Sequence, residues 1–389
     1  MHSNLNKMWL MTAASLVAVT SYVNADSESA QALVAASSYS NADSAQMRNL
    51  EKRVNTLEQT KGTGGMINPN GRPNVADGYD LFITADALLW QAHEGGLGFA
   101  VESDQNSAAT PLDHSSVENP HFEYEWGFRL GVGYNMKHDG WDLYGNWTHI
   151  DMESHHEEEG VDSDDFLWPV WIHPASPFAG YSVNEAEAHW KMHLNIADLD
   201  LGREFFTSKW LTLRPHVGLR SAWIKQRYDV DYEEFYNSSN VLSANEVDVD
   251  MRNNYWGLGP KFGIDTQWGL GSGWSIFGDA SFSLLYGFFH TYFHELDRGL
   301  NNIGVPYAAV NNSYRQSVAI TDLQLGLRWD HMFDKDHYHF GLQAGWEHHM
   351  FFSQNQMTRF VDNAEKGNFL QNQGDLTTQG WTLSARFDF

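Results

Sequence analysis

Residues 123–136 read EYEWGFRLGVGYNM, and two different faces are interleaved in this stretch. The residues in between carry all of its charges and glycines, whereas every second residue is apolar or aromatic: Tyr124, Trp126, Phe128, Leu130, Val132, Tyr134 and Met136. Successive side chains of a β-strand point to opposite faces, so a period of two predicts a strand. One face of this strand is apolar from end to end.

The same alternation recurs through the rest of the chain. It is found in residues 79–90, 141–150, 187–196, 210–224, 256–268, 274–284, 322–330, 338–347 and 381–389, which makes about ten strands in all. Two places interrupt the pattern. The phase shifts near Asp198, which suggests a β-bulge, and Pro215 would cost a ladder hydrogen bond in a central strand.

The connections between these strands alternate in length. Short ones fall at 137–140, 207–209, 269–273 and 334–336, and long ones at about 104–121, 153–186, 229–250, 290–313 and 353–376. Short turns at one end and long loops at the other are typical of an outer-membrane barrel, with Trp and Tyr near the strand ends. We therefore predict an all-β, transmembrane, antiparallel up-and-down barrel of ten strands over residues 76–389, with twelve strands as the alternative.

The N-terminal part predicts export and a small periplasmic segment. Residues 1–25 read as a signal peptide, with Lys7, an apolar core and a small residue at Ala25. Residues 26–75 are expected to be periplasmic. Within them Met47, Leu50, Val54 and Leu57 have coiled-coil spacing, so residues 44–60 form either a short oligomerisation helix for a homo-oligomer or an amphipathic helix lying on the barrel end.

Composition excludes several classes of protein. After residue 25 no window offers the roughly 18 apolar residues of a membrane-spanning helix. The net charge of -26 argues against nucleic acid as a partner. The chain has no cysteine, so neither disulfides nor thiolate chemistry are available. The partners that remain are outer-membrane lipid and lipopolysaccharide, together with the barrel-assembly machinery, which would read the terminal Phe389.

Several stretches together resemble one known family. YDLFITADALLWQAHEGGLGFA, GFRLGVGYNMKHDGWDLYGNWTHI, DLDLGREFFTSKWLTLRPHVGLRSAWI, NNYWGLGPKFGIDTQWGLG and SFSLLYGFF, in this order, are similar to the Legionella-type, major-outer-membrane-protein-like family over residues 79–389. The resemblance implies a pore-forming protein of the bacterial cell outer membrane, without catalytic residues or cofactor. The proteins for which this family is named crosslink the envelope through cysteines, and that role is closed to a chain without cysteine.

The polar faces of the predicted strands supply the candidates for pore lining. They are Asp80, Asp86, Glu125, Arg129, Lys191, Arg214, Arg220, Lys261, Asp265, Asp279, Asp322, Arg328, Glu347 and Arg386. We predict that these charges line a narrow, porin-like channel with a weak cation preference, through which small solutes diffuse passively. The alternative is that they pair across the lumen and plug it. Barrels of about eight strands are filled by side chains, so ten strands lie near the filled end. The lumen-facing glycines would widen the pore: Gly127, Gly131, Gly133, Gly257, Gly259 and Gly263.

Three acidic runs fall in the predicted loops, at 151–165, 229–237 and 245–250. They are solvated loops, or they attract cations and bridge divalent ions to lipopolysaccharide, or the HHEEE motif at 155–159 holds a transition metal. An adhesin acting through these loops is a second function. A hydrolase is a third, although acid–base chemistry requires histidines with carboxylates within hydrogen-bond reach. The histidines in or near the predicted loops include His149, His155, His156, His348 and His349.

Overall fold

The computed structural model describes residues 68–73, 75–104, 115–137, 140–160, 166–237, 239, 241–365, 367–372 and 374–389. These residues belong to one compact unit, Met66–Phe389. The predicted signal peptide (1–25) and the predicted helix at 44–60 lie outside the described residues. Among the described residues there is no helix of the length and apolarity that crossing a membrane requires.

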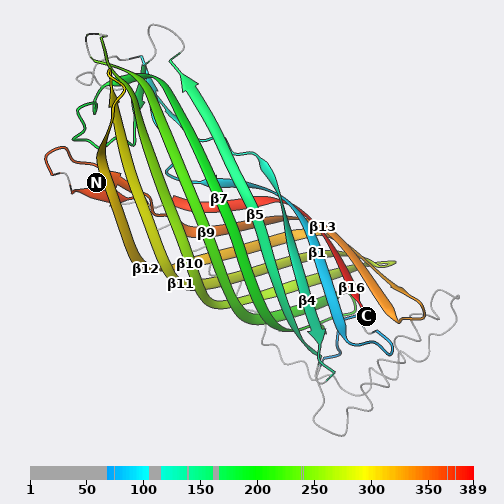
Figure 1. Ribbon diagram of the computed structural model, residues 1–389. Coiled ribbons are helices and arrows are strands. Elements are labelled where there is room, and N and C mark those ends of the chain that lie inside the picture. Colours follow the sequence, from blue (N-terminus) through cyan, green and yellow to red (C-terminus); the bar gives the residue numbers. More distant parts are fainter. Residues whose placement is uncertain are drawn as a thin grey trace, which may run out of the picture. The chain divides into compact units, whose positions relative to one another are not determined.

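Ten antiparallel strands close into a barrel (Figure 1). They are β1 (Leu81–Glu94), β4 (Tyr124–Asn135), β5 (Trp141–Glu159), β7 (Ser182–Arg203), β9 (Leu211–Tyr236), β10 (Leu242–Gly271), β11 (Trp274–Gly299), β12 (Gly304–Phe333), β13 (Tyr338–Asn355) and β16 (Gly374–Asp388). Each pairs with its neighbours along the chain, and β16 pairs with both β13 and β1, which closes the ring. The ten-stranded, all-β prediction is confirmed.

Short strands accompany the barrel between its long ones. The connection from β1 to β4 contains β2 (Ala100–Ser103) and β3 (Ser116–Glu118), and that from β5 to β7 contains β6 (Phe166–Pro169). β8 (Phe205–Phe206) precedes β9. β14 (Thr358–Phe360) and β15 (Phe369–Gln371) form a separate two-stranded sheet between β13 and β16.

The short connections lie at one end of the barrel, as predicted. They join β4 to β5, β7 to β9, β10 to β11 and β12 to β13. The ends of the barrel chain meet at this end too, because Leu81 and Phe389 exchange backbone hydrogen bonds of 3.3 and 3.0 Å. In an outer-membrane barrel this is the periplasmic end.

Two of the five long loops predicted for the other end are wrong. β9 and β10 continue to Tyr236 and Leu242, and β11 and β12 continue to Gly299 and Gly304, so only short turns join them. Residues 229–250 and 290–313 are therefore mostly strand, paired across the β9–β10 and β11–β12 seams. Polar and apolar residues alternate in these stretches too, but the polar residues face outward and the apolar residues face inward. A search for strands with apolar outward faces therefore missed them.

Polarity inverts partway along the strands, and β5 shows it best. Near the periplasmic end its outward residues include Trp141 and Trp147, while Asp142 and Thr148 point inward and are buried. Further along, the outward residues become Asp151, Glu153, His155 and Glu157, while the inward residues become Ile150 and Met152. Lipid outside and a polar lumen inside are thus replaced by water outside and an apolar interior.

The same inversion corrects the predicted bulge near Asp198. The ladders of β7 with β5 and β9 run through Asp198 without a register shift there. Asp198 and Trp190 face the same way, into the barrel, one in the polar part and one in the apolar part. What read as a change of phase is a change of environment. β9 likewise passes through Pro215, whose ring points outward and which pairs with Ile264.

The apolar outer band has the thickness of a bilayer. On β10 it runs from Trp268 to Trp256, and both indoles are exposed on the outer surface. Twelve residues at about 3.4 Å each, tilted by about 40–45°, span about 30 Å along the membrane normal. From Trp256 to Leu242 the strand continues for another 14 residues, which reach about 35 Å beyond the membrane by the same geometry. We call this outer part the extracellular extension.

Candidate functional site

A polar cavity of about 280 Å³ lies inside the membrane-spanning part of the barrel. Its walls come from all ten barrel strands. Eleven of the fourteen residues predicted to line a pore line this cavity: Asp86, Arg129, Arg214, Arg220, Lys261, Asp265, Asp279, Asp322, Arg328, Glu347 and Arg386. The alternation in the sequence therefore placed most of these side chains on the correct face of their strands.

One half of a continuous chain of ion pairs crosses this cavity from β4 to β12. Arg129 on β4 binds Glu347 on β13 at 2.8 Å and Asp86 on β1 at 3.2 Å. His349 connects Glu347, at 3.0 Å, to Asp322 on β12, at 2.8 Å. Four strands are tied together by these contacts.

The other half of the ion-pair chain runs from β12 to β7. Arg220 on β9 binds Asp322 at 2.6 Å and Asp198 on β7 at 2.8 Å. Lys261 on β10 binds Asp198 at 2.7 Å and Asp200 at 2.8 Å. Seven strands thus contribute to one chain of alternating charges, and its members neutralise one another across the lumen.

Two smaller groups of ion pairs lie nearer the periplasmic end. Arg214 joins Asp142 on β5 to Asp265 on β10, the second at 2.6 Å. His339 lies between Asp330, at 2.9 Å, and Asp388, at 2.7 Å, and these carboxylates are bound by Arg328 and Arg386, at 2.9 and 2.7 Å. Most of the lumen charges described here are therefore engaged with one another.

Three predicted lining residues lie elsewhere. Asp80 precedes β1 at the periplasmic rim and pairs with Lys137 at 3.4 Å. Glu125 has the inward phase of β4 but is not among the residues that line the cavity. The prediction for Lys191 is wrong: it faces outward from the extracellular extension with its side chain 46% exposed, beside Glu153. Its inward neighbours Trp190 and Met192 are fully buried.

Several functional carboxylates were missed by reading the sequence. Asp198 and Asp200 alternate with Leu199 and Leu201 in the stretch ADLDLG, which is the expected pattern of a lumen face. That signal was misread because the apolar positions preceding it, such as Leu194 and Ile196, also point inward. Asp142 lies in a weaker alternation and had no distinguishing signal beyond its phase.

The glycines of the lumen face do not widen it. A Cβ at Gly133 would overlap the ring of Phe82, and one at Gly263 would overlap the imidazole of His216. Both bulky side chains lie on neighbouring strands and occupy the space that the glycines leave. The prediction that glycine opens the pore is therefore wrong, since these positions let large side chains of the lumen pack.

The extracellular extension is filled by an apolar core. Its fully buried side chains include Trp90, Trp190, Tyr228, Phe289 and Phe293, contributed by the inner faces of β1, β7, β9 and β11. Segments from the connections add Leu97, Phe99, Leu167, Trp171, Met357 and Phe360 to the same cluster. Such dense apolar packing is typical of the interior of a water-soluble β-protein, and it lies on the extracellular side of the cavity.

Specific hydrogen bonds fix the inserted segments in this core. The hydroxyls of Tyr228 and Tyr232 donate to the carbonyls of Leu97 and Phe99, both at 2.5 Å. The indole of Trp171 donates to the carbonyl of Gly98 at 2.9 Å. These hydrogen bonds satisfy buried polar groups and hold the segments within the apolar core of the extracellular extension.

Five histidines were considered as members of a rim active site. His149, His155 and His156 lie in β5, and His348 and His349 lie in β13, so none is in a loop. His349 belongs to the ion-pair chain of the lumen. His155 faces outward 3.4 Å from Glu187, and His156 faces inward near Glu158. The five side chains are thus divided among different faces rather than gathered in one cleft.

Carboxylates form two rows across the outside of the extracellular extension. In register across β5, β7, β9 and β10 lie Glu157, Glu187, Asp231 and Asp248, and beside them Glu159, Glu185, Glu233 and Glu246. We call these eight residues the acidic face. Residues in register on adjacent strands are about 5 Å apart, where like charges repel. Burial and the neighbouring carboxylates raise the pKa of Asp231 to about 7 and that of Asp248 to about 6.

A basic row lies between the acidic face and the membrane. Lys191, Arg227 and Arg252 are in register across β7, β9 and β10, and they lie only a few residues beyond the outward indoles of Trp223 and Trp256. Arg252 also stacks over the ring of Tyr292, 5.4 Å from its centre. This basic row therefore lies just beyond the aromatic belt.

Comparison with known proteins gives the family. The family model described as the Legionella pneumophila major outer membrane protein precursor matches residues 71–389. The chain belongs to this family. Like the family it belongs to, the chain is an outer-membrane β-barrel, and its location is the bacterial outer membrane. A search of curated proteins finds no match.

Solved structures offer only distant likeness. The outer membrane protease OmpT from Escherichia coli shares 8% identity, over 82% of this chain and 99% of that one, with a TM-score of 0.39. The Pseudomonas putida toluene transporter TodX shares 10%, over 82% and 92%, with a TM-score of 0.27. Ail of Yersinia pestis, the attachment invasion locus protein, shares 12%, over 79% and 98%, with a TM-score of 0.18. Scores this low carry no argument about activity.

Proposed function

We propose that this family member is a closed-lumen barrel that anchors a solid, acidic extension outside the outer membrane, and that it acts as a binding surface for cationic partners. The inversion of strand polarity carries the proposal. A pore keeps polar side chains inward along its whole length, whereas here the inward side chains become apolar and fully buried beyond the membrane. The charges that would attract solutes lie on the outside instead.

The paired lumen charges favour the same conclusion. An open pore surrounds its lining charges with water, but Arg220 and Lys261 are nearly inaccessible to solvent and lie within 2.8 Å of their carboxylate partners. Moving solute past them requires breaking these contacts. These contacts support a lumen in which the buried charges pack against one another within the membrane part.

Conductance separates this proposal from diffusion through the barrel. We expect the refolded full chain in a planar bilayer with KCl on both sides to give no discrete conductance steps. Folding is verified on the same sample by the heat-dependent mobility of the barrel in SDS gels. Reproducible steps from folded protein would contradict the closed lumen.

The acidic face is the surface proposed to bind. Its eight carboxylates on four adjacent strands repel one another, and a polycation relieves this repulsion. We expect fluorescent polylysine to bind the protein in nanodiscs and to be released as salt shortens the screening length. The triple variant Glu187→Gln, Asp231→Asn, Asp248→Asn should bind at least about tenfold more weakly, as expected for the loss of about 1.4 kcal/mol or more.

A matched control removes equal charge from the opposite end. The variant Asp77→Asn, Asp334→Asn, Asp336→Asn changes three exposed carboxylates at the periplasmic end. At pH 8.5, above the raised pKa values of Asp231 and Asp248, both triple variants remove nearly the same net charge. The periplasmic variant should bind polylysine as the wild type does. Equal loss in both triple variants would mean that net charge rather than the acidic face governs binding.

The basic row suits lipopolysaccharide as a lipid partner. Lys191, Arg227 and Arg252 lie just beyond the aromatic belt, at the depth where phosphates of the outer leaflet lie. A shallow groove beside them is lined by Arg252, Asn254, His290, Tyr292 and Asn311. We propose that this row holds lipopolysaccharide phosphates. The triple variant Lys191→Gln, Arg227→Gln, Arg252→Gln should copurify with less lipopolysaccharide than the wild type.

A narrow channel is the second candidate, and one observation favours it. The polar cavity of about 280 Å³ lies within the membrane and is lined on every strand by hydrophilic groups. A channel would require the apolar core of the extension to rearrange. Steps in the bilayer experiment, with a reversal potential showing cation preference under a salt gradient, would establish it.

A further inference from the structure

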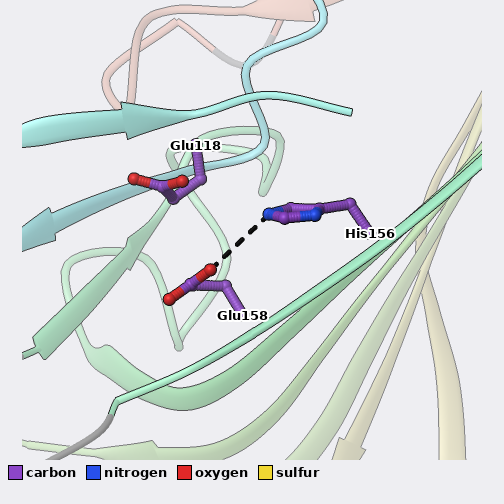
Figure 2. A group of neighbouring side chains, drawn as sticks. All are labelled: Glu118, His156 and Glu158. Atoms are coloured by element: carbon purple, nitrogen blue, oxygen red, sulfur yellow. Dashed lines mark ion pairs between the residues drawn. The ribbon is translucent and has the colours of Figure 1, made fainter. Parts of the chain in front are cut away.

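A second cluster of ligand-type side chains lies at the outer end of β5, away from the lumen charges. His156 and Glu158 lie two residues apart on the inward face of β5, and Glu118 of β3 lies opposite them (Figure 2). One ligand atom of each residue lies within 4.8 Å of those of the other two. All three residues are partly buried, so the cluster is shielded yet reachable from water.

The spacing within the cluster fits metal coordination. The Nε2 of His156 and the Oε2 of Glu158 are 3.5 Å apart, beyond the roughly 2.7–3.2 Å of an ordinary hydrogen bond. Two ligands of a tetrahedral ion at bond lengths of about 2.0–2.1 Å lie about 3.3 Å apart. The pair is therefore already close to the separation that one shared ion imposes, and Glu118, whose ligand atom lies within 4.8 Å of theirs, needs to approach by at most about 1.5 Å.

Neighbouring groups contact two of the three ligands, Glu118 and His156. The hydroxyl of Ser116 lies 2.9 Å from the Oε1 of Glu118 and 3.1 Å from the Oε2 of Glu102. Phe99 contacts the imidazole of His156 edge-on, with ring centres 5.7 Å apart. Ligand carboxylates and imidazoles of metal sites are held by such outer contacts. The imidazole and its oriented surroundings distinguish this cluster from the all-carboxylate group of Glu157, Glu159 and Glu185, which is exposed.

We propose that Glu118, His156 and Glu158 form a binding site for a first-row divalent transition metal, of which Zn²⁺ is the best fit. One imidazole and two carboxylates are the borderline donors that Zn²⁺ accepts, with water completing the tetrahedron. A bound cation neutralises the adjacent carboxylates of Glu118 and Glu158. The ion ties β3 to β5 and thereby fixes the connection between β1 and β4 on the barrel.

Cobalt serves as a visible probe of this site. The refolded, untagged full chain is treated with chelator, dialysed and titrated with Co²⁺ while the visible absorption is recorded, and Zn²⁺ is then added as a competitor. We expect one equivalent of Co²⁺ to bind and Zn²⁺ to displace it. Glu118→Gln, His156→Asn and Glu158→Gln should each weaken Co²⁺ binding by more than about tenfold.

The strand itself offers matched controls. His155→Asn and Glu153→Gln make the same chemical changes on the outward face of β5, so they should leave Co²⁺ affinity unchanged. Heat-dependent mobility in SDS gels reports folding for every variant. As a second measurement on the wild type alone, Zn²⁺ should slow amide hydrogen exchange at Ser116–Glu118.

The outcomes decide the proposal in either direction. Weakened binding in the three inward variants, with both controls unaffected, supports it. Failure of the wild type to bind Co²⁺ would overturn it, as would binding of Co²⁺ by folded Glu158→Gln as tight as by the wild type. If an inward variant does not fold, the wild-type exchange decides: no change in exchange of β3 on adding Zn²⁺ rejects the site.

Discussion

Arg220 is the residue on which the closed lumen can be tested most directly. Its guanidinium is buried between Asp198 and Asp322, at 2.8 and 2.6 Å. Removing one member of a buried ion pair leaves charge poorly compensated and costs roughly 3–5 kcal/mol. We therefore expect Arg220→Ala to lower the free energy of unfolding by this amount, measured by urea unfolding in lipid vesicles.

Arg227, on the same strand, provides the control for that measurement. It pairs with Asp229 at 2.7 Å but is about half exposed on the outer surface, and exposed pairs contribute about 1 kcal/mol or less. Arg227→Ala should accordingly change stability little. If Arg220→Ala cost no more than Arg227→Ala, the lumen charges would be hydrated as in an open pore, contrary to the function proposed here.

Individual residues could be assigned to a face from sequence only where the environment of the strand was known. Asp86 and Arg129 were placed correctly because lipid surrounds their strands. Lys191 was misplaced because its strand, β7, is surrounded by water at the height of Lys191, where a charged side chain points outward. Alternation fixes which residues share a face, but which face is inside depends on the solvent, and that is set by height above the membrane.

At the scale of elements, the segment between β6 and β7 can be tested through pH. The backbone amide of His173 donates to Glu295 at 2.7 Å, and the hydroxyl of Ser176 donates to Asp297 at 2.9 Å. Glu295 and Asp297 project inward from β11 in the extracellular extension. Burial, with the adjacent Asp297 carboxylate adding to it, raises the pKa of Glu295 to about 8; burial raises that of Asp297 too.

Raising the pH should loosen this segment. A group whose folded pKa is raised supports the folded state fully at pH below its ordinary value, near 4.5, and this support is lost as the pH rises through about 8. Between pH 6 and pH 9 we expect the amide protection factors of residues 171–176 to fall, measured by hydrogen exchange. The double variant Glu295→Gln, Asp297→Asn cannot ionise at either position and should keep the same protection at both pH values.

A constant protection factor in the wild type would contradict this account, and the amides of β12 near Leu325 serve as the internal reference.

The sequence predicted that 153–186 connects two strands, yet it could not show that part of this connection enters the barrel. Insertion depends on contacts such as those of Trp171 with Tyr228 and Tyr232, which exist only after distant strands have assembled. Strand number, by contrast, followed from local alternation alone.

For the molecule as a whole, strand number, closure and the side of the termini were predictable because a barrel in lipid must pair every backbone group. Parity then required both ends of the barrel chain to lie beside the short turns, as Leu81 and Phe389 do. The division into a membrane part and an extension was not predictable by the same rule. A strand surrounded by water does not need an apolar outward face. The alternation that marks lipid-facing segments therefore does not show how far the strands continue beyond the membrane.

The position of that division can be measured because the chain contains no cysteine. Single cysteines are introduced at three outward or turn positions of one hairpin: Arg252→Cys, Leu258→Cys and Ser272→Cys. Arg252 lies beyond the aromatic belt, Leu258 within the lipid-facing band, and Ser272 in the periplasmic turn.

On intact cells a membrane-impermeant maleimide should label only Arg252→Cys. After the outer membrane is permeabilised, Ser272→Cys should react too, while Leu258→Cys stays shielded by lipid. If the maleimide does not label Arg252→Cys on intact cells, the bilayer lies higher on the barrel. The apolar core would then lie inside the membrane. Labelling of Leu258→Cys would place it lower. The expected pattern places the boundary between Leu258 and Arg252, which agrees with roughly 35 Å of β-structure standing in water.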